Sequence, residues 1–126
     1  MNQEELNKIV DAWIAAEQAQ QGSPEHETNW WAVSEVLDWT LEGEGDRLWQ
    51  FIVEAYQRDV SDRIIGILAA GPVEDLLAKH GPEFIDRIED LARKDPKFNH
   101  LLGGVWRNTI NDEVWQRILR IRNHVW

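Results

Sequence analysis

The sequence contains no cysteine. This absence excludes disulfide bonds, thiolate zinc sites and cysteine nucleophiles. The chain also lacks an apolar run approaching the roughly 20 residues that a membrane-spanning helix needs. Its first residues, Met1 to Glu5, are polar and acidic, which is unlike a secretory signal. We therefore expect a cytoplasmic protein that has no membrane partner.

Recognisable catalytic motifs are missing as well. The chain has no phosphate-binding loop, no G-x-S-x-G, no H-E-x-x-H and no calcium loop. Its histidines are dispersed at His26, His80, His100 and His124. The sequence therefore predicts no catalytic residue, no metal site and no cofactor, and it favours a binding protein over an enzyme.

Positive charge is scarce in one half of the chain only. The net charge is −10. Residues 1–63 carry fourteen acidic and four basic side chains, whereas residues 64–126 carry nine of each. An acidic surface repels nucleic-acid phosphates and attracts basic proteins. We therefore expect a basic protein partner and no nucleic acid.

The length of 126 residues fits one domain with a real core. The polar stretch 22–28 is the best linker candidate, so the expected single domain, residues 1–126, consists of an N-terminal helix over residues 1–21 and a main helical body over residues 28–126. Eight tryptophans are an unusually large number. Each can bury on the order of 150–250 Å², so a few can dominate a core or an interface.

Apolar residues recur at helical spacing throughout, and no segment alternates like a strand. The fold class is therefore all-α, a compact bundle of seven to eight helices. Gly71-Pro72 and Gly81-Pro82 are expected to end one helix and begin the next. These two signals leave HEAT-like or armadillo-like helical hairpins open as an alternative. We expect helices over residues 2–20, 28–41, 47–58, 61–70, 72–79, 82–94 and 112–124, with a further turn near 96–102.

Several short motifs follow one another in the second half of the chain. They are Ala69–Leu77 (AAGPVEDLL), His80-Gly81, Asp95–Phe98 (DPKF) and Leu101–Trp106 (LLGGVW). Together they resemble a family of small uncharacterised bacterial proteins known only as a domain of unknown function. The resemblance covers about residues 45–120. It implies a bacterial or phage origin and an all-helical fold, and it implies no activity.

The tryptophans of the second predicted helix are candidates for partner binding. Trp30 and Trp31 are adjacent, so they point about 100° apart on a helix and are both buried only if that helix is covered on two sides. Acidic residues flank them, and exposed tryptophan is a common interface anchor. Trp39 and Trp126 are further candidates for exposure. The proposed partner-binding set is Trp30, Trp31, Glu35, Asp38 and Trp39.

A second candidate is a central polar cluster of Glu74, Asp75, His80 and Glu89. If these side chains converge on a pocket, they could serve a small ligand or an acid–base reaction. The structural alternative is that Glu74 and Asp75 oppose a helix N-terminus, and that His80 packs at a helix end. In that alternative Glu89 pairs with Arg93, as Asp90 does with Lys94.

Three functions follow from these observations. The first is a protein-interaction domain, such as an acidic immunity or inhibitor-type protein that binds a basic partner. The second is a ligand-binding or enzymatic domain that uses the Glu74, Asp75, His80 and Glu89 cluster. The third is a structural module that forms a homo-oligomer, such as a homodimer sealed by tryptophans.

Overall fold

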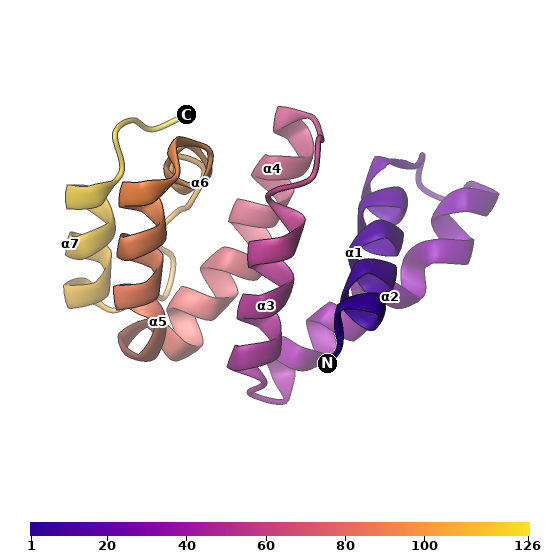
Figure 1. Ribbon diagram of the computed structural model, residues 1–126, viewed down its shortest axis with the longest axis horizontal. Coiled ribbons are helices and arrows are strands. Elements are labelled where there is room, and N and C mark those ends of the chain that lie inside the picture. The colour runs from indigo at the N-terminus through magenta and orange to yellow at the C-terminus, as the bar shows by residue number, and fades with distance from the viewer. The chain divides into compact units, whose positions relative to one another are not determined.

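The computed structural model describes residues 1–126. The chain is all-helical, as predicted, with 75% of its residues in helices and no strand (Figure 1). Its residues form two compact units, 1–64 and 65–126. None of the helices is both long enough and apolar enough to cross a membrane.

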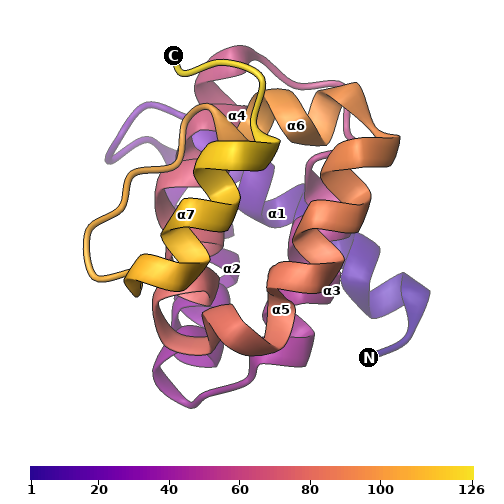
Figure 2. The ribbon, with the colours of Figure 1, turned by 90° about the vertical axis from the view of Figure 1, so that its left-hand side faces the viewer.

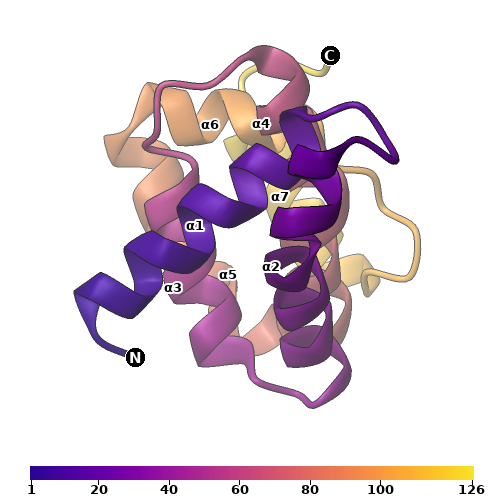
Figure 3. The ribbon, with the colours of Figure 1, turned by 90° about the vertical axis from the view of Figure 1, so that its right-hand side faces the viewer.

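The first unit is built from α1 (Gln3–Gln18), α2 (Pro24–Leu41) and α3 (Gly45–Ala55). Figure 3 shows α1 lying across α2 and α3, and each pair of these three helices is in contact. Phe51, which is fully buried, is the centre of the core. The ring of Trp13 meets it edge-on at 5.3 Å, and the ring of Trp39 does so at 6.4 Å.

The start of α2 differs from the prediction by one turn. Residues 22–28 were expected to be a loop, but α2 begins at Pro24. The Ser23 hydroxyl accepts a hydrogen bond from the His26 backbone N–H at 3.2 Å and so caps the helix. Proline is well suited to the first helical position because its fixed φ is already helical and it lacks the N–H that would be unpaired there. The loop between α1 and α2 is therefore only residues 19–23.

The two glycine–proline pairs do not separate helices. α4 (Asp62–Leu68), a π-helical turn η1 (Ala69–Val73) and α5 (Glu74–Lys94) follow one another without a break. Pro72 lies inside the π-helical turn, whose wider spacing tolerates the missing N–H. Pro82 is accommodated by a kink at His80, where φ is −133° and ψ is 24°. The chain therefore has six continuous helical segments rather than seven to eight, and the HEAT-like hairpins remain a prediction.

In the second unit α5 packs against α6 (Pro96–Leu102) and α7 (Asp112–Ile121). Figure 2 shows α7 beside α5, with α6 at one end of the pair. Each later helix has a polar cap, because Asp95 accepts from the Lys97 N–H and Asn111 accepts from the Val114 N–H. The largest buried apolar side chains of this unit are Leu68, Leu76, Leu77, Phe84, Ile85, Ile88, Phe98 and Leu101.

Trp126 anchors the C-terminal segment on the rest of the second unit. Its indole N–H donates to the His100 carbonyl at 2.8 Å, and its backbone N–H donates to the Gly103 carbonyl at 3.1 Å. A Cβ at Gly103 would lie 2.7 Å from the Trp126 ring and from the His124 carbonyl. Trp126 is therefore a docked residue, although 46% of its surface is exposed.

Candidate functional site

The exposed face of α2 carries an apolar stripe. Trp30, Leu37 and Leu41 lie at i, i+7 and i+11, which places them on one side of the helix. Their exposed fractions are 44%, 53% and 69%. Apolar residues also occupy the opposite, buried side of α2, including Ala32 and Val36. This helix is therefore apolar on two faces, and only one of them serves the core.

Acidic side chains border this stripe. Asp38 follows Leu37 and is exposed, as is Glu27, which lies three residues before Trp30. No cationic residue occurs anywhere in α2. We call the three apolar residues and this acidic border the α2 stripe. It combines exposed hydrophobic area with negative charge, which suits a partner that carries apolar and basic groups.

Trp30 and Trp31 point in different directions, as adjacent helical residues must. Trp30 lies on the α2 stripe, with its ring 4.9 Å from the ring of His26. Trp31 turns toward α1, where the Lys8 ammonium lies 5.9 Å from the centre of its ring. Both are close to half exposed, at 44% and 45%. The predicted partner-binding set is therefore divided between two adjoining surfaces.

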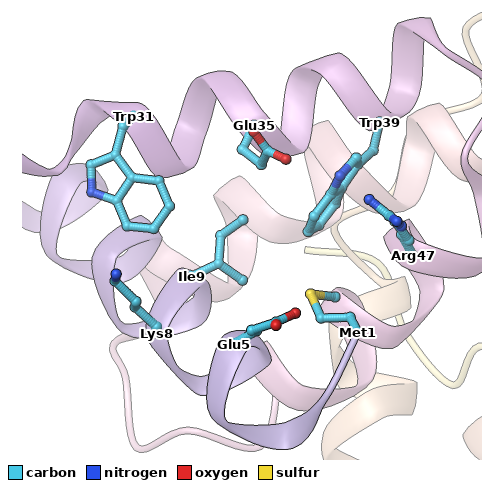
Figure 4. Close-up of a pocket in the computed structure, with 8 residues that line it drawn as sticks. All are labelled: Met1, Glu5, Lys8, Ile9, Trp31, Glu35, Trp39 and Arg47. Carbon is cyan, nitrogen blue, oxygen red and sulfur yellow. The ribbon is translucent and has the colours of Figure 1, made fainter.

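The second surface is a pocket between α1, α2 and the start of α3, with a volume of about 410 Å³. α2 contributes Trp31, Glu35 and Trp39, which lie at i, i+4 and i+8 on one helix face. Figure 4 shows these side chains opposite those of α1, with Arg47 at one end. We call this site the Trp39 pocket. Its lining residues are Met1, Glu5, Lys8, Ile9, Trp31, Glu35, Trp39 and Arg47.

Trp39 is buried, which contradicts its predicted exposure. Only 3% of its surface is accessible, because its ring packs on Phe51. Its indole ring extends into the space between Glu35, Met1 and Arg47 (Figure 4). The indole N–H is buried and has no hydrogen-bond partner in the protein. An unsatisfied buried donor costs about 1–3 kcal/mol, so this N–H is a position where an added acceptor would be favourable.

The charges of the Trp39 pocket are balanced within a strongly acidic unit. Lys8 and Arg47 are two of the four cationic side chains among residues 1–63, and Glu5 and Glu35 oppose them. The other two cationic residues are engaged elsewhere. Arg58 donates to the Asn7 side chain at 3.0 Å, and Arg63 donates to the Glu17 carbonyl at 3.0 Å.

Glu35 and Arg47 are lining residues of opposite charge whose side chains have no partner. Neither side chain makes a hydrogen bond or an ion pair with another residue of the chain, and Lys8 has only its contact with the Trp31 ring. Of these lining residues, Trp31, Glu35 and Trp39 are predicted from the sequence, whereas Lys8, Ile9 and Arg47 are not. The i, i+4 and i+7 or i+8 spacing of Met1, Glu5, Lys8 and Ile9 was visible in the sequence, whereas nothing marked Arg47.

Glu74 belongs to a structural contact within the second unit. Its side chain is 6% exposed and accepts hydrogen bonds from the Asn108 amide and the Trp106 backbone N–H. Burial raises the pKa of its carboxyl, and these two hydrogen bonds only partly oppose that rise. Glu74 therefore holds the 103–111 connection against the start of α5.

The other three members of the predicted polar cluster have separate surroundings. Burial raises the pKa of Asp75, and the charge of Lys79 opposes this rise. His80 occupies the kink of α5, with its Nδ1 3.9 Å from a carboxylate oxygen of Glu83. Apart from the repulsion between the neighbouring carboxylates of Glu74 and Asp75, no interaction joins the cluster.

Glu89 pairs with Arg117 of α7 rather than with Arg93 one turn away on α5. The Arg117 guanidinium donates to Glu89 through Nε at 3.1 Å and also through Nη2. Its Nη2 contacts Asp86 as well, at 2.5 Å. These hydrogen bonds lower the pKa of Glu89 and raise that of Arg117. The predicted Asp90–Lys94 pair is confirmed, with an N–O distance of 2.8 Å.

Comparisons with known proteins show the family of this chain. No curated protein and no solved structure shows significant similarity to it. A family model described as a family of unknown function, DUF6869, matches residues 19–125. The match begins well before residue 45 and therefore includes all of α2, which is a wider span than the motifs of the second half indicated. Because the family model covers most of the sequence, the chain belongs to the DUF6869 family of unknown function.

Proposed function

We propose that this protein is an interaction domain whose α2 stripe binds a basic protein, in the manner of an inhibitor or immunity protein. The single observation that carries the proposal is the exposure of Trp30, Leu37 and Leu41 on one face of a helix that has no cation. Exposed apolar residues grouped on one helix face are typical of binding surfaces in soluble proteins. A partner would bury them in the way that amphipathic helices bury theirs in a groove.

The charge of the first unit decides which partner is favoured. Residues 1–63 carry the whole net charge of −10. This field accelerates encounter with a basic protein and repels a second copy of the same chain. A heterologous basic partner therefore fits better than a homodimer. The absence of cysteine suits such an interaction in the reducing cytoplasm.

Two exposed residues of the stripe give the sharpest test. A Leu37→Gln/Leu41→Gln double variant removes apolar area without touching the core, since both leucines are more than half exposed. Leu119→Gln is the matched control, because Leu119 is an exposed leucine of α7 in the other unit. Each protein is immobilised and used to capture partners from a lysate of the source organism. The captured protein is then purified and its binding kinetics are measured.

We expect a basic protein that binds the wild type and the Leu119→Gln control equally and binds the double variant at least about tenfold more weakly. Its association rate should fall as the salt concentration rises from about 10 mM to about 150 mM, because the screening length drops from about 30 Å to about 8 Å. Equal binding to the double variant, or a salt-independent rate, would contradict the proposal. A wild-type dimer that the double variant abolishes would instead support the homo-oligomer.

A further inference from the structure

We propose that the Trp39 pocket binds a small zwitterion, a molecule with one carboxylate and one ammonium group on a short apolar body. Free amino acids and short peptides share this chemistry. The inference stands apart from the proposed function, because the pocket uses the face of α2 that turns toward α1 and not the α2 stripe. Three features of the pocket support it: its unpaired charges, its unpartnered indole N–H and its apolar wall.

The carboxylate end of the ligand is assigned to Arg47 and Trp39. Arg47 makes no ion pair or hydrogen bond within the protein, and it lies beside the Trp39 ring at one end of the pocket (Figure 4). A guanidinium presents paired donors that match a carboxylate. The unpartnered N–H of Trp39 offers one further donor there. A carboxylate is thus the group that satisfies both residues at once.

The ammonium end is assigned to Glu35 and Glu5. Glu35 of α2 and Glu5 of α1 line opposite sides of the pocket, and Glu35 has no partner in the protein (Figure 4). A carboxylate accepts the strong, charge-assisted hydrogen bonds that an ammonium donates. Lys8 occupies the far end over Trp31, which leaves Glu35 free for the ligand.

The body of the ligand is limited by the apolar wall and the volume. Trp31, Ile9 and the Trp39 ring supply apolar surface around the charged groups. A volume of about 410 Å³ lies in the lower part of the range for small-molecule pockets, roughly 300–1,000 Å³. The acidic unit around the pocket repels a free anion, whereas a molecule with both charges and no net charge escapes that repulsion.

The test follows the indole N–H signals of the intact protein by two-dimensional NMR, with a Trp39→Phe variant assigning the Trp39 signal. The probes are L-leucine, L-phenylalanine and L-leucyl-L-leucine. N-acetyl-L-leucine lacks the ammonium group and L-leucinamide lacks the carboxylate. Arg47→Gln and Glu35→Gln remove one charge assigned to each end of the ligand. Arg120→Gln and Glu25→Gln are the matched controls, since both residues are exposed and lie outside the pocket.

At least one of the three zwitterions should shift the Trp39 signal saturably below about 10 mM. Both blocked leucines should bind the wild type at least about tenfold more weakly than the zwitterion does. Both pocket variants should bind the zwitterion at least about tenfold more weakly than the wild type does, and the control variants should bind it equally well. Tighter binding of the dipeptide would identify peptides as the source, and tighter binding of leucine would identify free amino acids. The proposal is overturned if no zwitterion gives a saturable shift, or if the blocked leucines bind equally well.

Discussion

The two units of this protein are nearly equal in length but use their charged residues differently. Residues 1–64 carry all of the net charge of −10, whereas residues 65–126 carry as many basic as acidic side chains. In the second unit the charges pair with each other. Arg117 holds Glu89 and Asp86, Lys94 holds Asp90, and Arg107 lies 3.4 Å from Asp112.

In the first unit, by contrast, some charged side chains have no ion-pair or hydrogen-bond partner. Arg58 pairs with Glu54 and lies near Asp11, but Glu35 and Arg47 face a pocket without partners. Exposed apolar residues occur in both units, since Leu41 of the first is 69% exposed and Trp106 of the second is 70% exposed. The two units therefore differ in the pairing of their charged side chains and not in exposed apolar area.

The largest effect should come from the aromatic core of the first unit. Phe51→Ala removes the ring on which Trp13 and Trp39 pack, and it leaves a cavity at a fully buried position. We expect a loss of about 3–5 kcal/mol in the free energy of unfolding, measured by chemical denaturation. Gln50→Ala, an exposed change on the same helix, is the control. A loss below about 1 kcal/mol would mean that this core is not what holds the acidic unit together.

The Glu89–Arg117 pair should show how much the second unit depends on its charges. Glu89→Gln removes a carboxylate whose side chain is only 14% exposed, and we expect a loss of about 1–2 kcal/mol at neutral pH. Because the pKa of Glu89 is lowered in the folded protein, its stabilisation is complete above its ordinary value of 4.5. The stabilisation is lost as the pH falls from 4.5 through the lowered pKa.

The measurement for this pair is the unfolding free energy of wild type and variant between about pH 2 and pH 7. The difference between them should be constant at neutral pH and shrink below 4.5. Asp90→Asn is the matched control, because the Asp90–Lys94 pair is exposed on both sides and such pairs contribute roughly 0–1 kcal/mol. A difference that grows on acidification would contradict the assigned role.

Glu74 should give a smaller effect with the opposite dependence on pH. Burial raises its pKa above 4.5, so the folded state binds a proton at this carboxyl more tightly than the unfolded state does. Its contribution to stability is therefore complete below 4.5 and is lost as the pH rises through the raised pKa. Glu74→Gln keeps an acceptor but cannot ionise.

We expect Glu74→Gln to change the unfolding free energy by about 1 kcal/mol or less at neutral pH. Thermal unfolding at several pH values should show that wild type loses stability relative to the variant as the pH rises above 4.5. Glu83→Gln, an exposed change on the same helix, is the control. A wild type that gains stability over the variant in that interval would show that the hydrogen bonds outweigh burial.

The smallest effect on stability should come from the α2 stripe. Leu37→Gln exposes no new surface of the core, since Leu37 is already 53% exposed. We expect the free energy of unfolding, measured by thermal melting, to change by no more than about 0.5 kcal/mol. A larger loss would show that the stripe serves the fold.

Local signals in the sequence were sufficient for the fold class and for most helix ends. Periodic apolar residues predict the helices, and Asn111 predicts the cap of α7. Ser23-Pro24 carries the same kind of signal for α2 and marks its start one turn before the predicted residue. The prediction that each glycine–proline pair separates two helices is wrong. A proline inside a helix costs stability, but surrounding packing can offset this cost, and here a π-helical turn and a kink accommodate the two prolines.

The candidate sites could be predicted only in part. Trp31 and Glu35 were selected from their positions on α2, but the burial of Trp39 depends on Phe51 of another helix. The role of Glu89 likewise depends on Arg117, which lies 28 residues away in sequence. A pattern within one helix cannot identify a partner on the next.

The helical class and the uneven charge follow from the sequence, because periodicity and composition are properties of the chain. The three-dimensional packing is needed to know which tryptophan is buried, which carboxylate pairs with a guanidinium, and which charged side chains remain without partners beside a pocket. The physical reason is distance. Hydrogen bonds and packing act over a few ångströms between side chains, and folding brings together residues that the sequence keeps far apart.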